Sequence, residues 1–101
     1  MQLIQILLPL YDNDGQHFDE ALFARVREEL TTTFGGLTAF TRAPAQGLWT
    51  SDGETTHDEI VVFEVMVEEV EIKWWRTYRA RLERTFRQDT IVIRAQEVRI
   101  L

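Results

Sequence analysis

The chain has 101 residues and a net charge of −6, from 17 acidic and 11 basic residues. Its composition, 45% hydrophobic and 28% charged, is that of one globular domain with a single core. The absence of cysteine excludes a disulfide framework, a thiolate metal site and a cysteine nucleophile. Because the apolar runs are too short to cross a bilayer, we expect a single domain over residues 1–101, a cytoplasmic location and no membrane partner.

The excess of acidic residues argues against a nucleic-acid partner, because affinity for nucleic acid depends on cationic contacts with phosphates. Six of the eleven basic residues nevertheless lie between Lys73 and Arg87. At about 100° per residue, Lys73, Arg76, Arg84 and Arg87 fall near one side of a helix, opposite its apolar stripe. We interpret this side as a solvated helix face.

The first half of the chain is predicted to contain a strand, a helix and a second strand. Residues 2–8 form an apolar run of strand length that ends at Pro9. Apolar residues then recur every four positions from Phe18 to Phe34, as on one face of an amphipathic helix. Gly35-Gly36 follows as its terminator, and the alternating residues 37–43 indicate the second strand.

The second half repeats this pattern in the order strand, helix, strand. Residues 59–68 are rich in β-branched side chains and form the most strongly predicted strand. Residues 70–88 then place Trp75, Tyr78, Leu82 and Phe86 on one narrow helical stripe. Residues 90–96 give the last strand. The order β-α-β-β-α-β predicts an α+β, ferredoxin-like sandwich, with a four-stranded antiparallel sheet in the order 4-1-3-2 and two helices on one face.

Alternation along the strands assigns side chains to the two faces of this sheet. The inner set, toward the helices, is expected to include Ile4, Ile6, Leu8, Val61, Phe63, Val65 and Val67. The outer set is expected to be Leu3, Gln5, Leu7, Phe40, Arg42, Ile60, Val62, Glu64, Met66, Val92 and Arg94. A soluble monomer rarely exposes an apolar patch of that extent. We therefore expect a homodimer whose sheets face each other.

Two resemblances accompany this topology. The chain is similar in length and element order to the dimeric α+β barrel group of proteins, whose members include small monooxygenases, isomerases, haem-handling enzymes and binding proteins. It also resembles a set of short, uncharacterised bacterial proteins, on the landmarks Phe34-Gly35-Gly36-Leu37-Thr38, Gly47-Leu48-Trp49, Tyr78 and Phe86-Arg87-Gln88. The first resemblance implies sheet-to-sheet dimerisation, and neither implies one particular activity.

The connection over residues 44–58 is predicted to be a β-arm. Residues 50–54 are typical of a tight hairpin turn with Gly53 in the left-handed position. Leu48-Trp49 and residues 55–57 would be the two legs of the hairpin. Trp49 lies near the base of the arm. It either packs on the arm or covers the edge of the core, or it has a function as a clamp on a partner subunit or as an aromatic lid over a pocket.

Glu64 interrupts an otherwise apolar strand at its middle. An unpaired carboxylate on a face buried by dimerisation would be costly, so the residue needs either a function or a partner. It is a candidate general base or ligand-binding acid. The alternative is a structural ion pair or hydrogen bond with Arg94, Arg42 or Gln5.

Topology brings a second group of polar residues to one pole of the sheet. These are Tyr11, Asp12, Asp14, His17, Arg42, Trp49, His57, Asp58, Gln88 and Asp89. Neither histidine shows a spacing that is diagnostic of a metal site, and Asp12 to Gly15 are ordinary turn formers. We therefore expect no metal and no cofactor. Trp74, on the flank of its helical stripe, is interpreted as a packing residue or as an interface anchor.

These residues support three functional hypotheses. The first is a homodimeric domain that binds a small, partly apolar ligand, or serves as an accessory domain, through Phe40, Arg42, Trp49, His57, Glu64 and Arg94. The second is a cofactor-free enzyme of the monooxygenase or isomerase kind, with Glu64 or His57 as proton acceptor. The third is a purely structural module for protein interaction.

Overall fold

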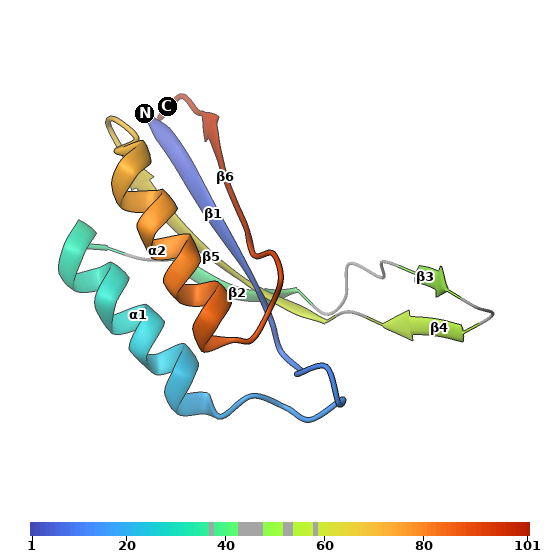
Figure 1. Cartoon of the computed structure of the whole chain (residues 1–101). Helices are drawn as coiled ribbons and strands as arrows, with labels where there is room; N and C mark the ends of the chain where they lie inside the picture. The colour runs from blue at the N-terminus through green and yellow to red at the C-terminus, as the bar shows by residue number, and fades with distance from the viewer. Residues whose placement is uncertain (37, 43–47, 52–53, 58) are drawn as a thin grey trace.

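The computed structural model describes residues 1–36, 38–42, 48–51, 54–57 and 59–101, and for the strands between residues 38 and 57 it describes the backbone alone. In chain order, the elements are β1 (Gln2–Pro9), α1 (Glu20–Phe34), β2 (Thr38–Arg42), β3 (Leu48–Ser51), β4 (Glu54–His57), β5 (Ile60–Val67), α2 (Ile72–Thr85) and β6 (Val92–Glu97). The two helices lie side by side over one face of the main sheet (Figure 1).

The described strands form two sheets. The main sheet has four antiparallel strands in the order β2-β5-β1-β6, and β3 pairs with β4 in a separate two-stranded sheet. In the main sheet, β1 is central, so Gln2 lies opposite both Val67 and Glu97. The chain ends therefore meet at one end of the sheet (Figure 1), where the Val98 amide donates to the Met1 carbonyl at 2.9 Å.

The fold class predicted from sequence is corrected by this arrangement. A βαββαβ sandwich has four strands in one sheet, whereas the described residues form six strands in two sheets, in the order βαββββαβ. The difference arises between β2 and β5, where Leu48–Ser51 and Glu54–His57 form a ladder with Leu48 opposite His57. Threonine and tryptophan favour extended backbone, which makes this short ladder possible. The predicted turn residue Gly53 lies outside the described residues.

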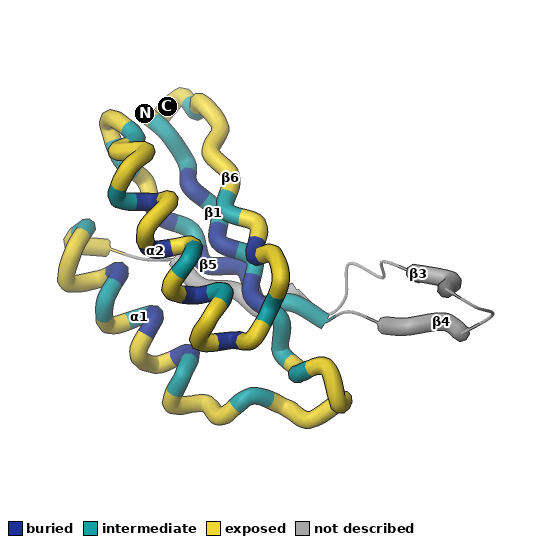
Figure 2. Tube along the Cα trace, viewed as in Figure 1, coloured by how far each residue is buried: buried dark blue, intermediate teal, exposed yellow. Residues whose placement is uncertain are grey.

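The core lies between the main sheet and the helices. Its buried residues are Ile4, Ile6, Leu8, Phe23, Val26, Leu30, Val61, Phe63, Val65, Trp75, Tyr78, Leu82, Phe86 and Ile91. The inward assignment of β1 and β5 is confirmed, with Val67 partly buried beside this core. Figure 2 shows the buried positions of β1 and β5 beneath the two helices. Every second residue of the strands thus packs against about every fourth residue of the helices.

Local chemistry fixes the ends of α1. Asp19 precedes its first turn, and the Asp19 carboxylate accepts a hydrogen bond from the Ala21 amide at 3.0 Å. At the other end, Gly35 adopts φ 77°, which favours glycine, and its amide donates to the Thr31 carbonyl at 2.8 Å. These caps set the helix over Glu20–Phe34, so it begins two residues after Phe18. Neither described helix is long and apolar enough to cross a membrane.

Candidate functional site

The side of the main sheet away from the helices carries a mixed surface, which we name the open face. Its members with described side chains are Leu3, Gln5, Leu7, Ile60, Glu64, Met66, Val92 and Arg94, while Val62, at an outward strand position, is buried. Met66 is 54% exposed and Val92 is 48% exposed, although both are apolar. Leu3 and Leu7 are half-buried. Exposed apolar side chains on three adjacent strands make this face a candidate interface.

A row of three polar side chains crosses the middle of the open face. Gln5 on β1 lies opposite Glu64 on β5 and opposite Arg94 on β6. The Gln5 amide nitrogen donates to the Glu64 carboxylate at 2.7 Å, and the Arg94 Nε donates to the Gln5 carbonyl oxygen at 2.8 Å. The structural partner predicted for Glu64 is thus present in Gln5, which connects the carboxylate to the guanidinium. We name these three residues the polar row.

The polar row has opposite charges at its two ends. Neither Glu64 nor Arg94 forms an ion pair with any residue whose side chain is described. The Glu64 Oε2 atom accepts the bond from Gln5, and no described donor bonds to its Oε1 atom. Among the described side chains, one carboxylate oxygen and most of the guanidinium therefore have no partner.

Next to the open face, a pocket of about 500 Å³ opens at the pole that the topology predicted, and we name it the pole pocket. Its lining includes Leu7, Pro9, Tyr11, Ile60, Gln88 and Val92. Apolar side chains from three strands thus meet the Tyr11 hydroxyl and the Gln88 amide. Gln88 donates through its amide nitrogen to the Phe86 carbonyl at 2.9 Å, which orients the side chain and leaves its oxygen as an acceptor.

Other members of the predicted polar cluster lie in a neighbouring hollow. Asp12, Asp14 and His17 line a pocket of about 490 Å³ together with Arg87. The Asp12 carboxylate accepts hydrogen bonds at 2.9 Å from the backbone amides of Asp14 and Gln16, so it stabilises its own turn. Among the residues that the structure describes, no three histidine or acidic side chains are placed to hold a metal ion.

The predicted ligand set is only partly assembled by the described residues. Glu64 and Arg94 are joined through Gln5. On β2, the backbone places Phe40 opposite Val62 and Arg42 opposite Ile60, which puts Arg42 beside the strand position that lines the pole pocket. Trp49 and His57 belong to the β3-β4 ladder. The side chains of these four residues lie outside the described part of the chain.

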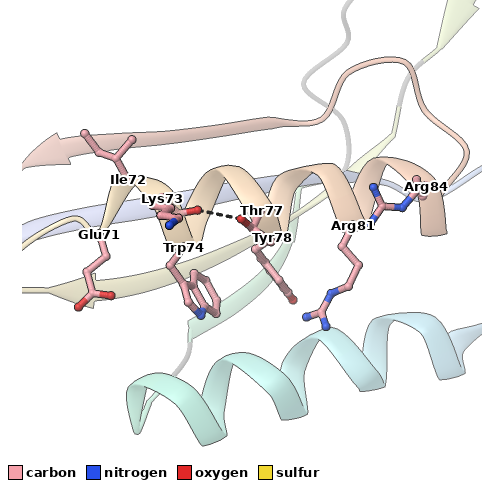
Figure 3. Close-up of a pocket in the computed structure, with 8 residues that line it drawn as sticks. All are labelled: Glu71, Ile72, Lys73, Trp74, Thr77, Tyr78, Arg81 and Arg84. Carbon is pink, nitrogen blue, oxygen red and sulfur yellow. Dashed lines mark hydrogen bonds between the residues drawn. The ribbon is translucent and has the colours of Figure 1, made fainter.

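The sequence did not indicate a third hollow, which runs along α2 and which we name the α2 groove. It encloses about 620 Å³ and is lined by Glu71, Ile72, Lys73, Trp74, Thr77, Tyr78, Arg81 and Arg84 (Figure 3). Apart from Ile72 in the first turn, these residues lie on one flank of the helix because their spacing follows its period. A tryptophan beside a basic row at that spacing is the signal that could have revealed the groove. Lys73 and Arg84, which line this groove, were predicted to lie on a solvated helix face.

Tyr78 lies in the floor of this groove with an unusual hydroxyl. The residue is only 3% exposed, and its Oη atom is buried with no hydrogen-bond partner in the described chain. Burial raises the pKa of Tyr78 well above its ordinary value and the nearby Glu29 carboxylate raises it further, whereas the Arg81 guanidinium opposes part of this rise. The Arg81 guanidinium lies over the ring, with Cζ 5.0 Å from the centroid, and pairs with Glu29 on α1. Arg81 and Glu29 therefore connect the two helices above this hydroxyl.

Comparison with known proteins gives a similar solved structure. No protein-family model and no curated protein matches this chain. A phage SAM lyase in complex with S-methyl-5'-thioadenosine has a similar structure, with a TM-score of 0.60. The match covers 95% of this chain and 80% of that chain, at 14% sequence identity. The chain therefore has the small α+β fold of that lyase.

Proposed function

We propose that the protein is a cytoplasmic homodimeric domain that binds a small, partly apolar ligand, with its two copies packed through the open face. The polar row carries this proposal. Hydrophobic exposure alone would suit many partners, whereas a row with a carboxylate at one end and a guanidinium at the other is complementary to a second copy of itself. The resemblance to dimeric α+β barrels agrees with this assembly.

The geometry of the row defines one symmetry axis. In face-to-face packing, two sheets lie about 10 Å apart and the two-fold axis runs between them. An axis parallel to β1 above Gln5 exchanges the β5 side with the β6 side. Glu64 of each copy then lies opposite Arg94 of the other copy, and two ion pairs form. An axis across the strands would instead oppose Glu64 to Glu64, which is unfavourable.

Charge reversal tests this axis. We expect Glu64→Lys alone, or Arg94→Glu alone, to raise the dimer dissociation constant by about 100-fold, because each places two like-charge pairs in the interface. The double variant should restore the wild-type constant to within about tenfold, because every pair is again of opposite sign. Within each copy, the Gln5 amide can turn and hydrogen-bond to the exchanged charges. Sedimentation equilibrium measures the constants.

Matched controls for this experiment lie on α1. Glu28→Lys and Arg25→Glu make the same charge changes on exposed helical positions and should leave dimerisation unchanged. A monomeric wild-type protein would refute the proposal. Failure of the double variant to recover, with both single variants monomeric, would refute the axis parallel to β1.

The ligand is proposed to bind in the pole pocket. The pocket volume of about 500 Å³ suits a small organic molecule. Its lining combines apolar side chains with the polar Tyr11, Asp12, Asn13, Glu59, Gln88 and Thr90, which suits a partly apolar one. Phe40, Arg42, Trp49 and His57 are proposed to complete the site from β2 and the arm, with Glu64 and Arg94 at its inner edge. The similar fold of a lyase in complex with S-methyl-5'-thioadenosine makes that compound the first probe.

Titration with S-methyl-5'-thioadenosine, followed by the amide signals of the protein, tests this site. We expect the largest shifts at Tyr11, Ile60 and Gln88. Gln88→Ala should weaken binding by about tenfold through loss of one hydrogen bond. Gln96→Ala, at an exposed position near the other end of β6, is the matched control and should leave the affinity unchanged. Shifts confined to residues distant from the pole would contradict the placement.

The second candidate is the cofactor-free enzyme with Glu64 or His57 as proton acceptor. The observation that favours it is the Glu64 Oε1 atom, which no described donor occupies, beside an oriented Oε2 atom. Product signals during the same titration would support this candidate. Glu64→Gln, which keeps the shape and removes the base, would then abolish turnover. An interaction module without a ligand would give neither shifts nor product.

A further inference from the structure

The α2 groove lies on the helical layer, away from the open face, and no function proposed above uses it. Its aromatic part is rigid. The Trp74 ring stacks on Tyr78 with centroids 5.0 Å apart and an interplanar angle of 23°. Phe34 and Trp75 meet the same ring edge-on at 5.1 Å and 4.8 Å. Trp74 nevertheless stays half-buried, so it presents a fixed apolar surface to the groove at little cost in conformational entropy.

The charges along the groove differ between its two ends. Near Trp74, the acidic Glu71 and the basic Lys73 offset each other. At the other end, Arg81 and Arg84 carry two positive charges, and Glu29 pairs with Arg81. Arg84 is exposed and forms no ion pair within the described part of the chain. Positive charge is therefore uncompensated at the Arg84 end, although the whole chain has a net charge of −6.

The spacing of the two features defines the length of a ligand. Ten residues separate Trp74 from Arg84, which is about 15 Å along a helix. Arg84 extends back along α2 toward Arg81 (Figure 3). A group held by the two guanidinium groups would thus lie roughly 10 Å from the Trp74 ring. A volume of about 620 Å³ accommodates a ligand of that length.

We propose that the α2 groove binds an elongated aromatic anion, with its ring system on Trp74 and its carboxylate or phosphate on Arg84 and Arg81. The buried Tyr78 hydroxyl supports this site independently. A buried donor without a partner is costly, and this one lies beneath the Arg81 guanidinium at the anionic end of the groove. A bound anion would draw the Arg81 guanidinium outward and accept a hydrogen bond from the Tyr78 hydroxyl.

The probe for this site is 4-biphenylcarboxylate, which has two aromatic rings and a terminal negative charge. We expect it to shift the indole NH signal of Trp74 in NMR spectra. Arg84→Glu should weaken binding by about tenfold or more, because charge-assisted contacts contribute strongly to anion recognition. The neutral 4-biphenylcarboxamide should bind more weakly than the acid by about the same factor.

The matched control is Arg79→Glu on the same helix. Arg79 is exposed and lines a different pocket, between α2 and β6, so this variant changes the net charge equally. It should alter the affinity by about twofold at most. Arg84→Gln is the second variant if the reversal perturbs folding, as checked by circular dichroism. Equal losses in both variants, equal affinity for the carboxamide, or an unchanged Trp74 signal would each overturn the proposal and leave the open face unaffected.

Discussion

Replacement of Phe86 by alanine should lower the free energy of unfolding by about 3–5 kcal/mol. Phe86 has no exposed surface, and its ring lies 5.1 Å from that of Phe18 and 5.5 Å from that of Phe23. It also ends α2, where its amide donates to the Leu82 carbonyl at 2.9 Å. The substitution therefore opens a cavity where α2, the start of α1 and the loop at the pole meet. Urea denaturation followed by circular dichroism measures the loss.

Ile72→Ala is the comparison variant for Phe86→Ala. Ile72 begins the same helix but is 58% exposed, so we expect a loss of about 1 kcal/mol or less. Both measurements need one protein concentration, because dimerisation would add to apparent stability. Similar losses at the two positions would show that Phe86 is not part of a closely packed core.

Tyr78→Phe should stabilise the protein at neutral pH by about 1 kcal/mol, because it removes a buried hydroxyl that has no described partner. Its larger effect is expected in alkaline solution. Burial, and then the Glu29 carboxylate, raise the pKa of Tyr78 above its ordinary value of 10.0. The folded protein thus retains the phenolic proton at a pH where the unfolded chain loses it. The pH-dependent contribution of Tyr78 to the free energy of unfolding is fully present below pH 10.0. It is lost as the pH rises toward the pKa of Tyr78 in the folded protein.

The wild-type free energy of unfolding should therefore fall more steeply than that of Tyr78→Phe in this range. Above the pKa of the unfolded tyrosine, proton linkage makes the wild-type slope steeper by about 1.4 kcal/mol per pH unit. Urea denaturation at about pH 9 and about pH 11 gives the comparison. Tyr11→Phe, at a position that is 40% exposed, is the matched control and should behave like the wild type. Parallel pH profiles for wild type and Tyr78→Phe would contradict the buried environment.

The periodicity of apolar residues was sufficient to predict most of the core between the main sheet and the helices. Apolar residues alternate around Ile6 and Phe63 and recur every four positions around Val26. These patterns correctly predicted which side chains are buried. The polar row was also partly visible, since Gln5 and Arg94 were named as partners of Glu64. Local patterns carry such information because burial and strand pairing are encoded every second or fourth residue.

The incorrect and missing predictions depend on longer-range packing. The sequence predicted the β3-β4 hairpin as an arm of the domain but did not count it as a separate sheet, so the fold class was assigned with too few strands. The sequence could not predict that the Tyr78 hydroxyl lacks a described partner, because Tyr78 occupies the same apolar stripe of α2 as any core aromatic residue. The ion pair between Arg81 and Glu29 could not be predicted either, because it depends on how α2 packs against α1.

The central position of β1 has a consequence for synthesis. β1 leaves the ribosome before both of its neighbours in the sheet, β5 and β6. The pairing of Gln2 with Val67 and Glu97 must close long loops, which slows folding. Until β5 emerges, the nascent chain carries an apolar strand with two open edges. This fold therefore favours binding of β1 by a chaperone during translation.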